Sequence, residues 1–166
     1  MVHPYPPHHD HLPHVGKYHY SLMFCTHDRH SVFVDAKRVE LALAQFLRAA
    51  GERKFDITAY CFMPDHVHLI VSGLNDDSDA KLFIGRAKQY SGFYFKREYG
   101  VPLWERYGFE HFIRDEMELA LTIRYVIANP VRAGLVIHPS EYPYLGSSRY
   151  SLEELLEICE YSTMVE

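Results

Sequence analysis

Apolar positions along this chain form short blocks bounded by turn residues, and the spacing within each block predicts its secondary structure. Short blocks rich in aromatic and β-branched residues are typical of strands. Two such blocks are separated only by the Met-Pro-Asp segment 63–65, which indicates a hairpin. We predict strands over residues 17–29, 55–62, 66–73 and 109–114.

Longer blocks repeat their apolar positions at helical spacing. We predict helices over residues 35–53, 79–100 and 116–128. The second should have an apolar seam made of Phe83, Ala87, Tyr90 and Tyr94. The third follows Asp115, with Glu118 three residues later as in a capping box. It should end before Pro130, because a proline disfavours helical backbone at the residue that precedes it.

The predicted elements follow the order strand–helix–strand–strand–helix–strand, with a further helix after them. This is the order of the split βαβ, or ferredoxin-like, fold. We therefore expect an α+β domain with one antiparallel sheet, helices on one face and an added C-terminal helix. The third strand is central in that topology. The domain should span residues 17–150, between a poorly ordered His/Pro-rich arm (1–16) and an acidic helix or tail (151–166).

The composition is that of a single globular domain. The chain has 166 residues, of which 48% are hydrophobic and 23% are charged. It has no apolar run near the roughly 18 residues of a membrane span, and its first residues lack the apolar segment of a signal peptide. The three cysteines form no Cys-x-x-Cys motif. We therefore expect a reduced, cytoplasmic protein with no membrane partner.

The net charge of −5 arises in the C-terminal tail. Residues 1–140 hold 16 basic and 16 acidic side chains, whereas residues 141–166 hold one arginine and six glutamates. Residues 81–97 are locally basic and contain no acidic side chain, which suits phosphate contact because fields act over roughly 8–10 Å in physiological salt. A solvated face of an amphipathic helix has the same pattern. The basic residues are Lys81, Arg86, Lys88, Lys96 and Arg97.

Two histidines interrupt the apolar third strand. His66 and His68 are two residues apart, so both rings point out of the same face of the strand. Two imidazoles in that arrangement can bind one divalent metal ion, with further ligands from elsewhere. Buried histidines that are hydrogen-bonded to the backbone are an equally simple explanation. Either way, burial of two unpaired polar rings costs free energy, so these rings need partners.

The last predicted helix offers such partners. Tyr125 and Asn129 are four residues apart and therefore lie one turn apart on one helical face. Asn129 offers an amide oxygen that can bind a metal, and Tyr125 offers a phenol. Arg124 is next to the tyrosine and can contact phosphate. Taken alone, in a chain with twelve other tyrosines, Tyr125 is better explained as a packing residue.

Three segments carry a resemblance to a known family. "MPDHVHLIV", "LWERYGFEHFIRDE" and "IRYVIANPVRAGLV" resemble the HUH single-tyrosine transposases, and most of all the REP-associated tyrosine transposases. The resemblance implies that His66, His68 and Asn129 hold Mg²⁺ or Mn²⁺. It implies that Tyr125 attacks a phosphodiester of single-stranded or hairpin DNA and forms a 5′-phosphotyrosine.

The resemblance also covers the stretch ahead of the tyrosine helix. Its residues are expected to pack or to position DNA rather than to do chemistry. They are Trp104, Glu110, His111 and Arg114. Phe109 departs from the pattern, because relatives usually have a second tryptophan there. DNA contacts are expected from Arg124 and from the basic residues between 81 and 97, in a nucleoid-associated protein.

The sequence leaves several alternatives open. One is a DNA-binding protein of the same fold that recognises a hairpin without cutting it. Another is a metal-dependent hydrolase that uses the histidine pair, with Tyr125 only structural. The sequence also does not decide between a monomer and a homodimer with a site shared between chains.

Overall fold

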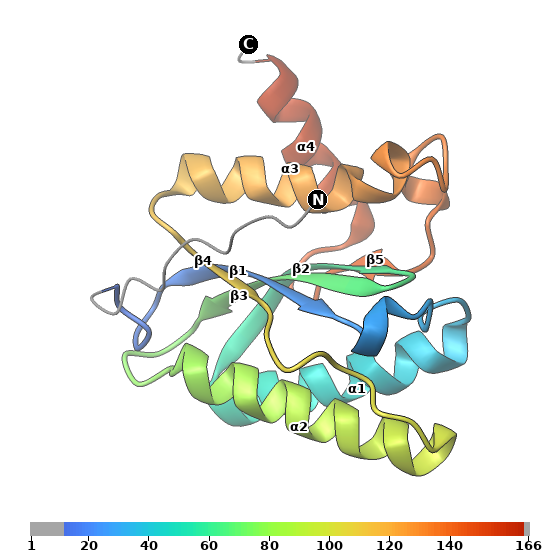
Figure 1. Ribbon diagram of the computed structural model, residues 1–166. Coiled ribbons are helices and arrows are strands. Elements are labelled where there is room, and N and C mark those ends of the chain that lie inside the picture. Colours follow the sequence, from blue (N-terminus) through green and yellow to red (C-terminus); the bar gives the residue numbers. More distant parts are fainter. Residues whose placement is uncertain (1–11, 165–166) are drawn as a thin grey trace.

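The computed structural model describes residues 12–164, with side chains described as far as residue 159. An antiparallel sheet with the strand order β4-β1-β3-β2-β5 forms its centre (Figure 1). The third strand is therefore central, as predicted. The strands are β1 (His19–Cys25), β2 (Phe55–Met63), β3 (His66–Gly73), β4 (Phe109–Ile113) and the short β5 (Leu145–Gly146).

Helices cover both faces of this sheet (Figure 1). Helices α1 (Ala36–Arg53) and α2 (Ala80–Tyr99) lie side by side on one face. Helix α3 (Glu116–Arg132) covers the other face and packs against α4 (Leu152–Met164). Two single turns of 3₁₀ helix, η1 (His27–Arg29) and η2 (Pro139–Glu141), complete the elements. The expected α+β class is confirmed, with the tyrosine helix separate from the α1–α2 layer.

The two faces of the sheet have different cores. The larger core lies under α1 and α2 and is rich in phenylalanine, including Phe24, Phe46 and Phe62. A smaller core of aliphatic side chains lies under α3 and includes Ile70. Because side chains alternate along a strand, residues 67, 69 and 71 of β3 belong to the larger core. His66 and His68 therefore share the α3 face with Ile70.

The hairpin between β2 and β3 is tied to the segment that follows β1. The carbonyl of Asp65 accepts hydrogen bonds from the backbone N–H and the hydroxyl of Thr26, each 3.0 Å long. The carbonyl of Pro64 accepts bonds from Val32 at 2.8 Å and Phe33 at 3.0 Å. Thr26 is fully buried, so these bonds are shielded from water. The turn that precedes the histidine pair is thus held at three points along another loop.

Helix α3 continues through Pro130 to Arg132, so the prediction that it ends before the proline is wrong. Proline lacks one N–H, and near a helix end its loss leaves only one carbonyl without its usual donor. The helix then closes with bonds from Ala133 to the Asn129 carbonyl (2.9 Å) and from Leu135 to the Pro130 carbonyl (2.9 Å). Gly134, with φ of 75°, supplies the left-handed residue that such an ending requires.

The seam of α2 also differs from the prediction. Tyr90 and Tyr94 are only half-buried, whereas Ser91 is fully buried. The serine hydroxyl donates to the Ala87 carbonyl at 2.6 Å and accepts a bond from the Trp104 indole at 2.8 Å. A polar residue with both bonds made can occupy a core position. The buried residues of α2 are Ala80, Phe83, Ala87, Ser91 and Phe95.

The first eleven residues of the predicted N-terminal arm lie outside the described part of the chain. Its last residues contact the start of α2. The His14 carbonyl accepts a bond from the Ala80 N–H at 2.8 Å, and the Gly16 N–H donates to the Ser78 carbonyl at 2.8 Å. Gly16 also lies directly against Gly73, at the end of β3.

This close approach predicts that Gly73→Ala destabilises the protein. An added Cβ would lie 2.1 Å from the Gly16 carbonyl oxygen, so the backbone must move, at a cost of about 1–3 kcal/mol. Gly51→Ala is the control, because an added Cβ there meets nothing within 4 Å and alanine favours the helix by roughly 0.5–1 kcal/mol. Urea denaturation of the variants measures both changes. A Gly73→Ala protein as stable as the wild type would contradict this packing.

Candidate functional site

The two histidines of β3 point their Nε2 atoms toward each other on the α3 face. These atoms are 3.2 Å apart, and the rings are nearly perpendicular at 86°. Two nitrogens bound to one ion at about 2.1 Å lie roughly 3.0–3.4 Å apart, so the pair fits a shared metal. Their cross-strand neighbours on β1 and β2 all carry sulfur. These neighbours are Met23, Cys25, Cys61 and Met63.

Asp65 fixes the ring of His66. Its Oδ1 lies 2.7 Å from His66 Nδ1, and its Oδ2 accepts bonds from Arg29 at 3.2 and 3.1 Å. Burial opposes ionisation of Asp65, but the bond from His66 and the charge of Arg29 outweigh it and lower the pKa of this carboxyl. An ionised Asp65 accepts the Nδ1 proton of His66. The Nε2 atom is then left as an acceptor, which is the usual arrangement around a metal-binding histidine.

His68 is kept neutral at physiological pH. Burial, together with the neighbouring His66 and the charge of Arg132, lowers the pKa of His68 to about 3. A neutral imidazole is the form that binds metals. The pair therefore presents two nitrogen ligands without first having to lose a proton from His68.

Tyr125 stands at the edge of this pair. Its ring centroid is 6.1 Å from that of His68, and the two rings are close to perpendicular. The side chain is 55% exposed, so a substrate can reach the phenol from solvent. The structure thus brings together His66, His68 and Tyr125, although about 60 residues separate the strand from the helix.

Arg132 is a residue that sequence reasoning missed. Its guanidinium carbon lies 3.8 Å from the centroid of the Tyr125 ring, and its Nη2 donates to the Tyr125 carbonyl at 3.0 Å. The two residues are seven positions apart, which is two helical turns. A spacing of seven brings two side chains together only within one continuous helix. The helix predicted from the sequence stops before Pro130, so the contact between Arg132 and Tyr125 could not be predicted.

Asn129 lies one turn after Tyr125 on α3. Its Nδ2 atom is buried and has no hydrogen-bond partner within residues 12–159. A buried N–H group without a partner costs about 1–3 kcal/mol, so a ligand that changes the contacts of this amide can recover that free energy. A 180° turn of the Asn129 side-chain amide exchanges the positions of Oδ1 and Nδ2. The oxygen can then occupy this position as a metal ligand. Two histidines and an amide oxygen fit a divalent ion.

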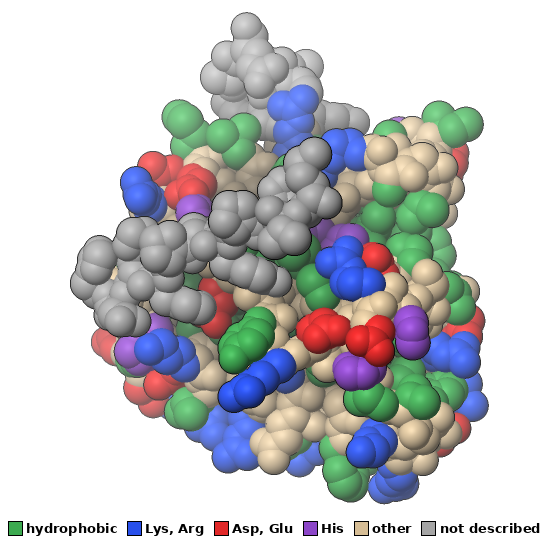
Figure 2. All heavy atoms as spheres, viewed as in Figure 1, with side chains coloured by type: hydrophobic (Ala, Val, Ile, Leu, Met, Phe, Trp, Pro, Cys, Tyr) green, Lys and Arg blue, Asp and Glu red, His purple; other side chains and the backbone are tan. Residues whose placement is uncertain are grey.

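A second group of possible ligands lies at the end of β1. Atoms of His27, Asp28 and Glu105 lie within 4.8 Å of one another. Asp28 is exposed and its N–H donates to Glu105 Oε1 at 2.6 Å, so the group is already partly paired. None of its members belongs to the predicted ligand set. In Figure 2, histidine, acidic and basic side chains gather below α3 on the face shown.

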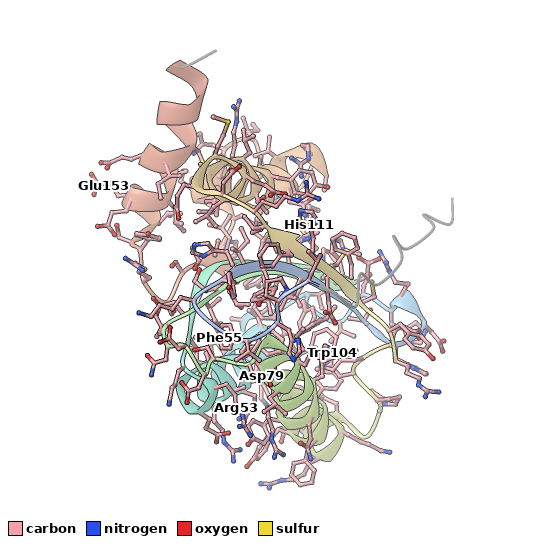
Figure 3. All side chains as sticks on the ribbon, turned by 90° about the vertical axis from the view of Figure 1, so that its left-hand side faces the viewer. Arg53, Phe55, Asp79, Trp104, His111 and Glu153 are labelled. Atoms are coloured by element: carbon pink, nitrogen blue, oxygen red, sulfur yellow. The ribbon has the colours of Figure 1, made fainter. Side chains whose placement is uncertain are left out.

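The residues ahead of α3 mainly pack. Trp104 stacks on Phe46 with centroids 5.9 Å apart, on the α2 side of the sheet (Figure 3). His111 lies on the α3 side and pairs with Glu118, which also accepts a bond from the Arg114 N–H at 2.7 Å. These contacts fasten β4 to the start of α3. Glu110 points to the other face of β4, toward α2.

The predicted DNA-contacting cations lie in two places. Arg124 is half-buried on α3 beside Tyr125. The others lie on α2, which is separated from the histidine pair by the sheet (Figure 1). Lys88 is half-buried and donates to the carbonyls of Glu105 and Arg106. Arg86 is half-buried and donates to Gln89 at 3.0 Å. Lys81, Lys96 and Arg97 are exposed.

Comparison with known proteins identifies relatives. Residues 14–126 match the family described as "Transposase IS200 like". A Haemophilus influenzae protein classed as a putative REP-associated tyrosine transposase is 32% identical over an alignment of 108 positions, which covers 57% of this chain and 60% of the relative. The Escherichia coli K12 REP-associated tyrosine transposase is 27% identical over 99 residues, 59% of this chain and 58% of the relative. The aligned part thus spans about three-fifths of each relative.

A solved structure shares the fold. It is a REP-associated tyrosine transposase bound to a REP hairpin, with a TM-score of 0.70 and 20% sequence identity. The match covers 87% of this chain and 82% of the other. Among residues 12–164, no helix is both long enough and apolar enough to cross a membrane.

Proposed function

This chain belongs to the IS200-like transposase family, and from that premise we propose that it cuts and rejoins single-stranded DNA at hairpin ends through a covalent phosphotyrosine. The observation that supports the proposal most strongly is the position of Tyr125 beside the histidine pair, with its ring 6.1 Å from that of His68. The structural relative is bound to a REP hairpin. We propose hairpin DNA as the substrate class here as well.

Three residues of this chain would hold a divalent ion, Mg²⁺ or Mn²⁺. His66 and His68 present Nε2 atoms that are 3.2 Å apart, and Asn129 has a buried amide without a partner in the described chain. When bound, such an ion stabilises the charge that develops on the oxygens of the scissile phosphate. Asp65 orients His66 for this task through the bond to Nδ1.

Tyr125 is the proposed nucleophile. Phenols ordinarily have a pKa of about 10, so a tyrosine needs help to react at neutral pH. The guanidinium of Arg132 lies 3.8 Å from the ring centroid and donates to the Tyr125 carbonyl, so it helps to position the phenol beside His68. In the proposed step the phenolic oxygen bonds to phosphorus and the bond from phosphorus to the 3′ oxygen breaks. Solvent accepts the phenolic proton, and the leaving oxygen takes up a proton to become a 3′-hydroxyl.

The covalent intermediate allows joining as well as cutting. The phosphotyrosine bond retains the energy of the broken phosphodiester, so a free 3′-hydroxyl can attack it and release Tyr125 without ATP. The same step with a different DNA end transfers the strand. A hydrolase would instead pass the phosphate to water and would not need the tyrosine. A non-cleaving hairpin-binding protein would need neither the tyrosine nor the metal.

We predict that Tyr125→Phe abolishes covalent adduct formation. The wild type, incubated with labelled hairpin DNA and Mn²⁺, should give an adduct on a denaturing gel, because the phenolic oxygen forms the bond. Tyr99→Phe is the matched control, since the Tyr99 hydroxyl is buried without a hydrogen-bond partner in the described chain. Cleavage that persists in Tyr125→Phe would favour the hydrolase, and binding without cleavage by the wild type would favour the non-cleaving protein.

We also predict that Arg132→Gln slows adduct formation, because the guanidinium positions the Tyr125 ring. At pH 7 the rate should fall roughly 2- to 30-fold, the range expected for a cation–π contact of about 0.5–2 kcal/mol. Arg149→Gln is the control, since Arg149 lies 5.4 Å over Tyr150, away from the site. An adduct rate in Arg132→Gln equal to that of the wild type would mean that Arg132 does not position the phenol.

A further inference from the structure

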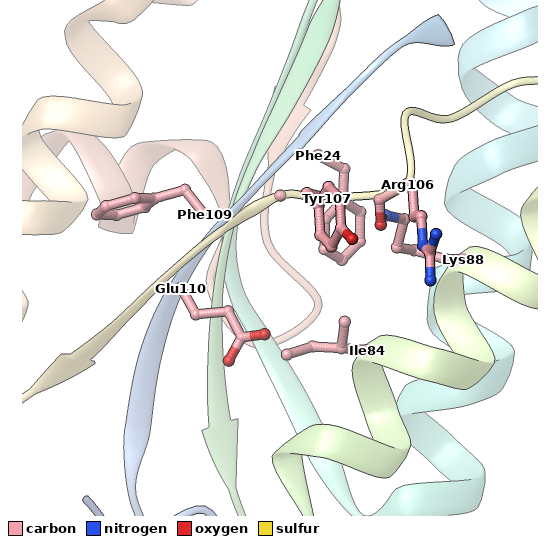
Figure 4. A pocket seen from close by; sticks show the side chains of 8 residues that line it. Phe24, Ile84, Lys88, Arg106, Tyr107, Phe109 and Glu110 are labelled. Atoms are coloured by element: carbon pink, nitrogen blue, oxygen red, sulfur yellow. The ribbon is translucent and has the colours of Figure 1, made fainter. Parts of the chain in front are cut away.

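A groove lies on the side of the sheet opposite the histidine pair, between α2, the start of β4 and the loop before it (Figure 4). Its volume is about 320 Å³. Phe24 is buried at its base, and Ile84 of α2 closes one side. Tyr107 is 67% exposed, so its ring is accessible from solvent. The remaining side chains that matter here are Lys88, Arg106 and Glu110.

The wall of the groove is held in place by backbone contacts. Lys88 Nζ donates to the carbonyls of Glu105 at 2.9 Å and Arg106 at 3.2 Å. Gly108 allows the loop to lie against β1, because an added Cβ would be 2.6 Å from the Met23 carbonyl oxygen. The groove is therefore built by packing between α2, β1 and the loop.

Two cations line the groove. Lys88 Nζ is 5.6 Å from the centroid of the Phe24 ring, and the Arg106 guanidinium is 5.4 Å from that of Tyr107. Burial lowers the pKa of Lys88, and a partly desolvated ammonium attracts an anion more strongly than one in water. Aromatic faces beside cations are the usual features of a site that stacks a base and contacts its phosphate.

Glu110 adds a preference among the bases. Its carboxylate extends into the groove on the side of Ile84 (Figure 4). An ionised carboxylate only accepts hydrogen bonds. Guanine presents two adjacent donors, N1–H and N2–H, on its Watson–Crick edge, whereas adenine presents one donor and one acceptor there. A carboxylate therefore matches unpaired guanine best, and unpaired bases are read on this edge.

The groove is within reach of the same DNA strand. Phe109 of β4 lies opposite Met23 of β1, which lies opposite His68 of β3. Two strand spacings separate β4 from β3, or about 10 Å. Strand β4 is the edge of the sheet, so a single strand can pass around it from one face to the other. Glu110 is the residue after Phe109 and therefore points to the groove side.

We propose that this groove binds an unpaired guanine of the strand whose phosphate is held at the histidine pair. The base stacks on Tyr107, its two donors contact the Glu110 carboxylate, and the adjoining phosphate lies beside Lys88 and Arg106. This inference rests on the proposed function, because it takes single-stranded DNA as the substrate. It adds a base preference that the metal and tyrosine site does not supply.

Fluorescence anisotropy with labelled oligonucleotides tests the proposal. The probes are twelve-residue oligo-dT strands with one central dG, dA or inosine, titrated in EDTA at one salt concentration. The wild type should bind the dG probe roughly tenfold more tightly than the dA probe, as expected for a bidentate contact. Inosine lacks the N2 amino group and should fall between them. Glu110→Gln should shift the preference toward dA, because an amide offers one acceptor and one donor.

Two further variants make the outcome decisive. Glu40→Gln removes the same charge from an exposed position on α1 and should leave the base preference unchanged. Tyr107→Ala should weaken binding of every probe, because stacking does not depend on the base. The proposal is overturned if the wild type does not distinguish dG from dA. It is equally overturned if Glu110→Gln changes all probes alike, as a pure charge effect would.

Failure of this inference is separable from failure of the proposed function. The binding titration requires neither metal nor cleavage, whereas the adduct assay reports on Tyr125. A guanine preference without any adduct would refute the proposed chemistry and support guanine binding in the groove. Adduct formation without a base preference would support the proposed chemistry and refute guanine binding in the groove.

Discussion

The site depends above all on the contact between Asp65 and His66. The carboxylate accepts a hydrogen bond from His66 Nδ1–H, with Oδ1 and Nδ1 2.7 Å apart, and this leaves Nε2 directed toward His68. Arg29 holds the other carboxylate oxygen, and buried Thr26 holds the Asp65 backbone. Without these supports the ring of His66 is free to turn, and the two nitrogens no longer converge. The hairpin turn therefore does more than reverse the chain direction.

Strand alternation supplies the second constraint. Every other residue of β3 belongs to the phenylalanine-rich core, so the histidines must face α3. A register shift of one residue would move both histidines into that core and is strongly disfavoured. Helix α3 then brings Tyr125, Asn129 and Arg132 to this face from a single element. The larger core therefore fixes the position of β3, and the polar side chains of the site lie on the opposite face, under α3.

Local sequence patterns predict the order of the strands and helices and the main residues of the candidate site. The period of two along residues 66–68 and the spacing of four between Tyr125 and Asn129 are visible in the sequence, and so is the ferredoxin-like order. The role of Arg132 was not visible, because Pro130 is a strong local signal for a helix end and tertiary packing overrides it here. The groove at Glu110 depends on how a loop packs on β1, and no local pattern encodes that contact.

We propose that the histidine pair and Asn129 form the metal site of this chain. Anomalous diffraction from crystals soaked in Mn²⁺ can locate the ion. We expect a peak bonded to Nε2 of both His66 and His68 and to the amide oxygen of Asn129, near Tyr125. A peak at the second group, His27, Asp28 and Glu105, with none between the two histidines, would contradict it.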